Sequence, residues 1–343
     1  MTDIAVRELA LERGGFRLGP IDLAIPGGSA TVVLGPSGAG KTTLLRALAG
    51  FLGLRTGSIT IDGVPMEHEA PERRGFGFVP PSLGLFPDRR VERNVSYALD
   101  LVGDPSADEE LRGWMERFDL VRLARKYPSE LSSGERQRVA MARALASHPR
   151  FLLWDEPLNA LDVESRDASI RLLRDLIEEH HLPLLLVTHD PSTAIALASR
   201  LVVLEQGRVR FNGRPEELAA APIDRFTARF LGYENLYTAA ELRASATSPL
   251  AAALVRAAGP GGLVVPDGAV RGSGERWVGD TTARVAAVRW AAPGWSIALE
   301  VGGLLVHVHA SHELPTVRVG ALVGMSIDPA KVKPLEESLG IVA

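Results

Sequence analysis

Short apolar runs alternate with stretches of helical spacing through the first two thirds of the chain. Runs at 30–34, 151–154 and 184–187 are apolar throughout, as strands buried on both faces are. Between the first two, residues 87–149 mix charged and apolar positions at helical spacing. Buried strands separated by helices form largely parallel sheets with functional residues at the carboxyl ends of the strands. This part of the chain therefore predicts an α/β fold.

Looser alternation marks antiparallel strands around that sheet. Residues 4–23 alternate as two strands, with turn signals at Gly14-Gly15 and Gly19-Pro20. Residues 57–63 form a short strand ending in Asp-Gly, which is a hairpin signal, and residues 201–211 contain two runs joined through Gln-Gly. We expect these segments to form an antiparallel part of the first domain.

The pattern changes after Leu231. An Ala-rich stretch, 238–258, is of helical character, and a linker is expected over about 238–275. Short strands are then predicted at 263–265, 283–290, 296–301, 304–309 and 321–327. These spacings predict a small antiparallel barrel, so the chain divides into residues 1–231, with a helical subdomain at about 87–149, and an all-β domain at 232–343.

A glycine-rich phosphate-binding pattern follows the first buried strand. The segment Gly35-Pro36-Ser37-Gly38-Ala39-Gly40-Lys41-Thr42-Thr43 fits G-x-x-x-x-G-K-[ST] and precedes leucines at helical spacing. Its backbone N–H groups and the start of the helix would surround a polyphosphate. Lys41 would reach the β- and γ-phosphates, and the Thr42 hydroxyl would ligate Mg²⁺.

Polar residues end the next two buried strands. Asp155 and Glu156 are adjacent carboxylates, whose mutual repulsion is costly in a low-dielectric site. A Mg²⁺ on Asp155, with Glu156 orienting or deprotonating a water, would relieve that cost; a solvated strand end is the alternative. His189 could hydrogen-bond a γ-phosphate or simply be satisfied at the strand terminus.

Two further candidates have ordinary structural alternatives. Ser132-Ser133-Gly134-Glu135 precedes a helical run, and exposed N–H groups there would form a second anion site. Taken alone, a helix N-cap explains this pattern. Phe16 could stack on an adenine or pack in the core.

Composition limits the compartment and the partners. The 343 residues carry a net charge of −4, which offers no general electrostatic attraction to nucleic acid or anionic lipid. There is no cysteine, so disulfides and thiolate metal sites are excluded. The sequence shows neither a long apolar run nor a signal-peptide pattern at its start. We therefore expect a cytoplasmic protein for which another chain supplies any membrane part.

Residues 1–231 resemble the nucleotide-binding subunit of ABC transporters. Gly35 to Thr43 resembles the Walker A loop, Leu131 to Glu135 the signature motif, and Phe151 to Glu156 Walker B with its catalytic glutamate. Asn159 to Asp162 resembles the D-loop and His189 the switch histidine, all in the family's order. Phe16 is similar to the aromatic A-loop residue. The resemblance implies a P-loop NTPase of the ABC fold, with ATP and Mg²⁺ as cofactors.

The family mechanism implies a composite site between two identical subunits stacked head to tail. Ser132 and the N–H near Gly134 of one copy would bind the γ-phosphate held by Lys41 of the other. Mg²⁺ on Thr42 and Asp155, Glu156 beside the water, and His189 would serve hydrolysis. One departure is Pro81, which stands where the family's Q-loop has glutamine, and a proline offers neither a side-chain oxygen nor an amide.

The remainder of the chain resembles the TOBE domain, an OB-like β-domain of importer ATPases. The resemblance is carried by Leu231 to Leu236 and Val323 to Pro329, and residues 85–94 are most similar to molybdate, tungstate or sulfate importers. It implies transmembrane permease subunits, a solute-binding protein and a position at the cytoplasmic face of the membrane, without nucleic acid. Sugar, polyamine or ferric-ion importers are alternatives, and a soluble non-transport ABC ATPase is an alternative of another class.

Two expectations concern ligands of this second domain. We expect it to bind a small oxyanion or a regulatory partner. His307 and His309 lie two apart, with His312 nearby, and imidazoles at that spacing can chelate a metal. Without a third placed ligand, a solvated strand face is the simpler interpretation.

Overall fold

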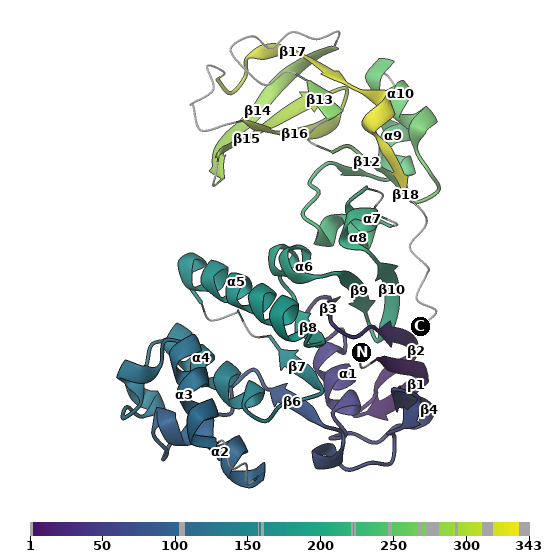
Figure 1. The fold of residues 1–343 in the computed structure, drawn as a ribbon. Coiled ribbons are helices and arrows are strands. Elements are labelled where there is room, and N and C mark those ends of the chain that lie inside the picture. The colour runs from purple at the N-terminus through teal and green to yellow at the C-terminus, as the bar shows by residue number, and fades with distance from the viewer. Residues whose placement is uncertain are drawn as a thin grey trace. The chain divides into compact units, whose positions relative to one another are not determined.

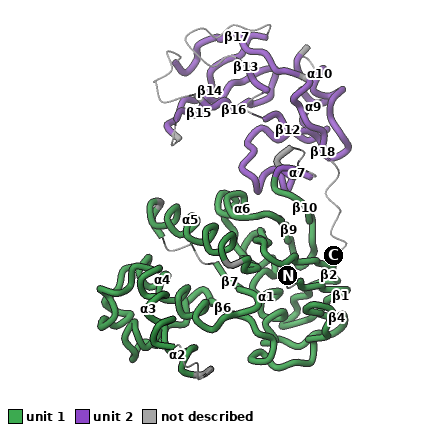
Figure 2. The backbone as a smooth tube through the Cα atoms, viewed as in Figure 1, with its two compact units in different colours: residues 1–215 green, residues 216–343 purple. Residues whose placement is uncertain are grey.

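The computed structural model describes most of the chain in two compact units, residues 1–215 and 216–343 (Figure 2). The described residues are 3–102, 107–156, 158, 161–220, 222, 224–245, 249–266, 269–271, 281–291, 294–310 and 318–335. The domain boundary predicted at residue 231 stays a prediction.

The first unit is built on a six-stranded sheet that is parallel except at one edge. The order is β10-β9-β3-β8-β7-β6, and the β9–β10 hairpin is the antiparallel edge. The strands are β3 (Ala30–Leu34), β6 (Phe76–Val79), β7 (Phe151–Asp155), β8 (Leu184–Thr188), β9 (Arg200–Glu205) and β10 (Arg208–Gly213). Every residue of β3, β7 and β8 is buried, which confirms the interpretation of the three apolar runs as strands inside the sheet.

A second sheet of this unit is antiparallel, in the order β2-β1-β4-β5. Its strands are β1 (Ile4–Arg13), β2 (Phe16–Ile25), β4 (Thr56–Ile61) and β5 (Val64–Pro65). The Gly14-Gly15 turn is confirmed, but the turn expected at Gly19-Pro20 is wrong because β2 continues through it. The β1–β2 register shifts beside this point, and the Gly19 N–H donates to Gly207 O at 2.8 Å, so the irregularity is absorbed inside a strand.

Helix α1 (Lys41–Leu48) lies in the core between the two sheets of this unit (Figure 1). Leu44, Leu45 and Leu48 are fully buried against apolar side chains from both sheets. The other helices of the unit are α2 (Val91–Val102), α3 (Ala107–Arg117), α4 (Ser133–Leu145), α5 (Val163–His180) and α6 (Pro191–Leu197). Helices α2, α3 and α4 contact one another, as expected for the helical subdomain. The first unit is therefore the predicted α/β fold with an antiparallel part.

The second unit contains two antiparallel sheets with short helices. The sheets have the orders β11-β12-β18 and β13-β17-β14-β15-β16. The strands are β11 (Leu236–Tyr237), β12 (Gly262–Val264), β13 (Val270–Arg271), β14 (Thr281–Ala291), β15 (Gly294–Val301), β16 (Leu304–Ala310), β17 (Leu322–Ile327) and β18 (Lys333–Leu335). Helices α7 (Pro215–Ala220), α8 (Arg225–Phe230), α9 (Ala239–Ala244) and α10 (Pro249–Ala257) precede or join them. The unit has its own apolar core, so the expected antiparallel β-domain is confirmed.

Candidate functional site

The phosphate loop joins the end of a central strand to a buried helix. Chain segment 35–40 leaves β3, and α1 begins at Lys41. The Gly35 N–H donates to Thr188 O at 3.3 Å, which attaches the start of the loop to the end of the neighbouring strand β8. Gly40 has φ 103°, a left-handed conformation that glycine adopts without strain. The loop is thus held where strands β3 and β8 end.

Lys41 is folded over this loop and is 5% exposed. Its Nζ donates to Gly35 O at 2.8 Å and to Pro36 O at 3.0 Å, and it lies 3.4 Å from Glu156 Oε1. A buried ammonium requires such partners because desolvation penalises its charge. Lys41 therefore brings a positive charge to the inner wall of the loop.

Thr42 and Asp155 meet beside that lysine. The Thr42 hydroxyl donates to Asp155 Oδ1 at 2.9 Å. Asp155 is fully buried, and its Oδ2 has no hydrogen-bond partner among the described residues. Burial raises the pKa of this carboxyl, and the nearby Glu156 adds to the effect. An unpartnered carboxylate oxygen next to a threonine hydroxyl is a donor set that fits Mg²⁺.

Glu156 follows directly at the end of β7 and points its carboxylate toward two other candidates. Besides its contact with Lys41, its Oε2 lies 2.7 Å from His189 Nδ1. Its own backbone has φ 53°, which is uncommon for a residue other than glycine, and its N–H donates to Val187 O at 3.0 Å. The three residues predicted as catalytic, Lys41, Glu156 and His189, are therefore brought together: Lys41 follows the loop after β3, and Glu156 and His189 directly follow β7 and β8.

A cavity of about 440 Å³ opens over the phosphate loop. It is lined by Arg13, Phe16, Ser37, Gly38, Gly40, Lys41, Thr42, Thr43 and Glu156. Phe16, the predicted aromatic residue, thus lines the same cavity as most of the phosphate loop. Ala39 of the loop does not line it; its carbonyl accepts a hydrogen bond from Gly207 N at 2.9 Å.

Arg13 is a lining residue that the sequence analysis missed. It pairs with Phe16 across the Gly14-Gly15 turn, so both side chains belong to one hairpin end. The signal was present in the sequence, because a two-residue turn places the residues on either side of it opposite each other. Arg13 adds a second positive charge to a cavity that otherwise has Lys41 alone.

The signature segment lies at the start of α4 and does not line this cavity. Ser132 is the N-cap; its Oγ accepts from Glu135 N at 3.2 Å, and Glu135 Oε2 accepts from Ser132 N at 2.8 Å. The hydrogen bond from the Ser132 backbone lowers the pKa of Glu135. This reciprocal pattern is a capping box, so the structural interpretation of the motif is correct for the single chain.

Gly134 approaches the start of another helix. A Cβ at Gly134 would lie 3.5 Å from Ser165 Oγ, so Ser133 and Gly134 in the first turn of α4 lie near the first turn of α5. Asp162, the N-cap of α5, accepts from Ser165 N at 2.9 Å and from Ser165 Oγ at 2.8 Å. These hydrogen bonds lower the pKa of Asp162. The signature segment and Asp162 thus lie near each other, at the starts of α4 and α5. Asn159 and Ala160 of the predicted D-loop lie outside the described residues.

Pro81 lies exposed in the loop that follows β6. The Leu83 N–H donates to Pro80 O at 2.8 Å, and Arg143 of α4 donates to Gly84 O and Leu83 O at 2.6 and 2.9 Å. Burial lowers the pKa of Arg143. The hydrogen bonds from Arg143 to these backbone carbonyls therefore attach the loop to the helical subdomain. Pro81 has no N–H group and donates no hydrogen bond in the loop.

The histidine pair of the second unit offers no metal site in the part of the chain that is described. His307 Nδ1 lies 3.3 Å from Glu234 Oε2, and no group of three metal-binding side chains is found there. His312 lies outside the described residues. No helix of those residues is long and apolar enough to cross a membrane.

Comparison with known proteins gives consistent matches. A family model described as "ABC transporter" matches residues 18–159. The Fe(3+) ions import ATP-binding protein FbpC of Streptomyces avermitilis is 40% identical over 272 residues, covering 78% of this chain and 76% of that protein. The sulfate/thiosulfate import ATP-binding protein CysA of Mycolicibacterium paratuberculosis is 41% identical over 232 residues, 67% of this chain and 64% of that protein. The spermidine/putrescine import ATP-binding protein PotA of Nitrosomonas europaea is 38% identical over 242 residues, covering 70% and 67%.

Solved structures match about two thirds of the chain. The dimeric post-hydrolysis structure of the ATP-binding cassette MJ0796 bound to ADP and Pi is 27% identical, with a TM-score of 0.55, and covers 62% of this chain and 98% of that one. Part of the ABC transporter complex cbiONQ, cbiO1 of Clostridium perfringens, is 27% identical with a TM-score of 0.59, covering 67% and 94%. On these matches and the geometry above, the chain belongs to the ATP-binding subunits of ABC importers, and it is an ATPase.

Proposed function

We propose that the chain hydrolyses ATP in the cavity over the phosphate loop and thereby drives uptake of an inorganic oxyanion such as molybdate, tungstate or sulfate. The observation that carries the proposal is a set of side-chain contacts. Thr42 donates a hydrogen bond to Asp155, and Glu156 contacts both Lys41 and His189. Asp155 ends a parallel strand, Glu156 and His189 each follow one directly, and Lys41 and Thr42 begin the helix after the phosphate loop. This edge is where α/β sheets bind ligands.

The residues divide the work by their chemistry. Lys41 leaves the loop carbonyls to bind the β- and γ-phosphates, and the loop N–H groups bind the remaining oxygens. Glu156 orients and deprotonates the attacking water, since its carboxylate already faces the cavity, and His189 holds that carboxylate and donates to the γ-phosphate. Phe16 stacks on the adenine at the far wall.

Thr42 and Asp155 hold Mg²⁺ in this proposal. The ion neutralises charge on the β- and γ-phosphates when it is bound. Asp155 Oδ2, which lacks a partner among the described residues, is the oxygen available to it. The Thr42 hydroxyl turns from Asp155 Oδ1 to offer its own oxygen.

The complete site requires a second copy of the chain. Ser132, Ser133, Gly134 and Glu135 at the start of α4, and Asp162 nearby, do not line the cavity of their own chain. The first turn of α4 presents N–H groups and the positive end of a helix of 13 residues, which favours an anion. We infer that this surface closes over the γ-phosphate of the partner copy, as a head-to-tail homodimer bridged by ATP.

The assembly places the chain at the cytoplasmic face of the membrane, bound to permease subunits that take cargo from a solute-binding protein. Residues 232–343 are a TOBE-like domain of this subunit. The named relatives carry different cargoes, which fits a cargo chosen by those other subunits. The similarity of residues 85–94 to oxyanion importers supports an oxyanion.

The test of hydrolysis is Glu156→Gln, with Glu178→Gln, an exposed residue near the other end of α5, as the matched control. The Glu156→Gln protein should bind ATP and dimerise on it, yet hydrolyse it about 10²- to 10⁴-fold more slowly, while the control keeps the full rate. Full ATPase activity in Glu156→Gln would refute the assignment.

A ferric-ion cargo is the second candidate, favoured by the match to FbpC over 78% of this chain. Proteoliposomes that contain this chain and the permease subunits that co-purify with it, with the solute-binding protein added outside, separate the two cargoes. Radiolabelled molybdate or sulfate should accumulate with ATP inside, and Fe³⁺ should not. Accumulation of Fe³⁺ alone would replace the oxyanion.

A further inference from the structure

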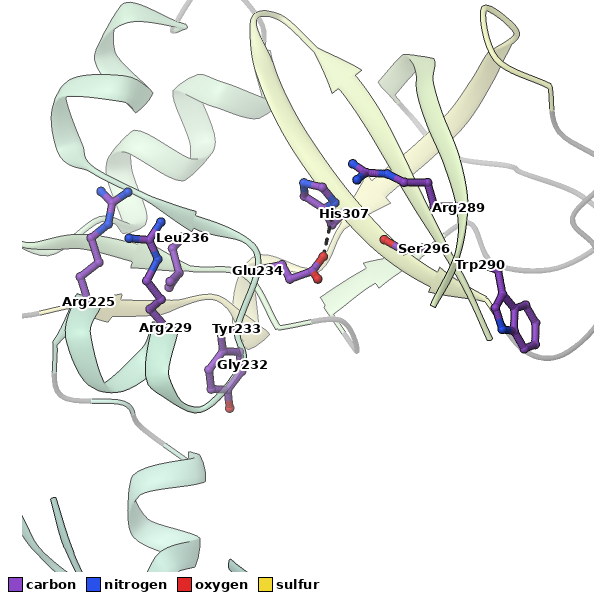
Figure 3. A pocket seen from close by; sticks show the side chains of 10 residues that line it. All are labelled: Arg225, Arg229, Gly232, Tyr233, Glu234, Leu236, Arg289, Trp290, Ser296 and His307. Atoms are coloured by element: carbon purple, nitrogen blue, oxygen red, sulfur yellow. Dashed lines mark ion pairs between the residues drawn. The ribbon is translucent and has the colours of Figure 1, made fainter. Parts of the chain in front are cut away.

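The second unit contains a cavity rich in arginine. It has a volume of about 590 Å³ and lies between helix α8 and the long strands β14, β15 and β16 (Figure 3). Arg225 and Arg229 project from α8 on one side, and Arg289 of β14 extends its guanidinium toward His307 on the other (Figure 3). A volume of this size is typical of pockets for small organic molecules.

The charges of the lining do not cancel. Three arginines face one acidic side chain, Glu234, so two net positive charges remain when His307 is neutral. Glu234 is engaged by His307 at 3.3 Å, and Arg225 lies 3.5 Å from Glu241. Among the described residues, Arg229 and Arg289 form no ion pair, so their guanidinium groups are available for an anion.

The cavity is built on a rigid connection between its two walls. Asn235 is 1% exposed; its Nδ2 donates to His307 O at 2.7 Å, and its Oδ1 accepts from His307 N at 2.6 Å. The Tyr237 hydroxyl donates to Leu305 O at 2.8 Å. The segment after α8 is therefore attached along β16, which joins the backbones of the two walls.

We propose that this cavity binds a phosphate monoester of a small organic molecule. Arg289, whose guanidinium points toward His307, binds the phosphate dianion, and Arg229 on the opposite wall adds a second positive charge to the cavity (Figure 3). Ser296 supplies a hydroxyl for hydrogen bonding, and the volume leaves room for the organic part of the ligand. Inorganic oxyanions would fill only a fraction of this space.

Calorimetry on the full chain tests the proposal. Phenyl phosphate and glucose 6-phosphate are titrated in turn, with a non-hydrolysable ATP analogue and Mg²⁺ in excess so that the nucleotide site is occupied. Inorganic phosphate, benzoate and glucose are the comparison ligands. The variants are Arg229→Gln and Arg289→Gln; Arg284→Gln, an exposed arginine of the same strand β14 outside the cavity, is the matched control.

The expected result is binding of at least one monoester with a Kd of about 1 mM or lower. At such an affinity, the loss of one charge-assisted contact can be measured. Arg229→Gln and Arg289→Gln should each weaken it by about tenfold or more, and Arg284→Gln should leave it unchanged. No heat with either monoester would overturn the proposal. So would binding that both lining variants leave intact, or binding of inorganic phosphate alone. Far-ultraviolet circular dichroism of each variant confirms that the fold is retained.

Discussion

Thr42 Oγ1 donates a 2.9 Å hydrogen bond to Asp155 Oδ1 across 113 residues of sequence. The bond joins the phosphate loop after β3 to the end of β7 and satisfies only one oxygen of a fully buried carboxylate. Asp155 is thus a charge that the folded protein tolerates without a full set of partners. Sites of this kind trade stability for function, because the ligand supplies the missing interaction.

Replacing Asp155 with asparagine should therefore stabilise the metal-free protein near neutral pH. Burial raises the pKa of Asp155, so the folded state disfavours its ionised form, and that penalty is present above the raised pKa. We expect Asp155→Asn to melt about 2–5 °C higher than the natural protein at pH 7.5 in EDTA. The difference should vanish as the pH falls below the ordinary aspartate value, where the carboxyl is protonated in both states. Differential scanning calorimetry at both pH values measures it, and a lower melting temperature at pH 7.5 would contradict it.

Gly40 should tolerate alanine less well than Gly38. Both have positive φ, 103° and 81°, but a Cβ at Gly40 would lie 2.9 Å from both Phe16 Cζ and Leu18 Cδ1, whereas a Cβ at Gly38 meets nothing within 4 Å. Backbone strain alone should raise the Kd for ATP by about tenfold in Gly38→Ala, and the added crowding should raise it by about 100-fold in Gly40→Ala. Calorimetric titration of ATP into both variants makes the comparison. Equal affinities would show that the crowding is relieved by side-chain movement.

Arg74 is a buried arginine that ties down the end of α1. It is 3% exposed and donates to Ala47 O, Leu48 O, Glu67 O and Glu69 O at 2.8–3.2 Å. Arg74→Met leaves these carbonyls without their donor, so the free energy of unfolding should fall by about 3 kcal/mol. Urea denaturation measures the change. The control is Arg73, the exposed neighbour of Arg74. Arg73→Ala should lower the free energy of unfolding by less than about 0.5 kcal/mol.

Pro81→Gln should raise the ATPase rate. Proline at this position offers no amide to the attacking water and no oxygen to Mg²⁺, and a glutamine would restore both. We expect at least about a tenfold gain in kcat, the value of one added hydrogen bond in the transition state. Steady-state phosphate release from Pro81→Gln is compared with that from Ser82→Ala, which alters the same loop without adding an amide. An unchanged rate would mean that Pro81 does not limit turnover.

The site could be predicted from the sequence where local pattern carries the geometry. Gly35 to Thr43 specifies a loop whose backbone conformation depends on its own glycines, and the strands that end at Asp155 and Thr188 are apolar throughout. Their parallel pairing follows from the rule that buried strands separated by helices form parallel sheets. The cavity is lined by the predicted residues Phe16, Ser37, Gly38, Gly40, Lys41, Thr42, Thr43 and Glu156, but not by Gly35, Pro36 or Ala39.

What the sequence could not indicate depends on long-range packing. Arg74 stands beside Glu72 and Arg73, a charged run that looks solvated, and only the folded chain brings its guanidinium to the carbonyls of α1. The 53° φ of Glu156 is imposed by its hydrogen bond to Val187 in the neighbouring strand. The turn expected at Gly19-Pro20 failed because its irregularity is resolved within β2, a matter of register between β1 and β2.

The adjacency of β3, β8 and β7 in the sheet has a consequence during synthesis. His189 leaves the ribosome about 150 residues after Lys41, which takes roughly 8–30 s at about 5–20 residues per second. Until then β3 lacks its partner β8, and its apolar faces have no sheet to join. The strand that carries the phosphate loop therefore gains its neighbour β8 only late in translation.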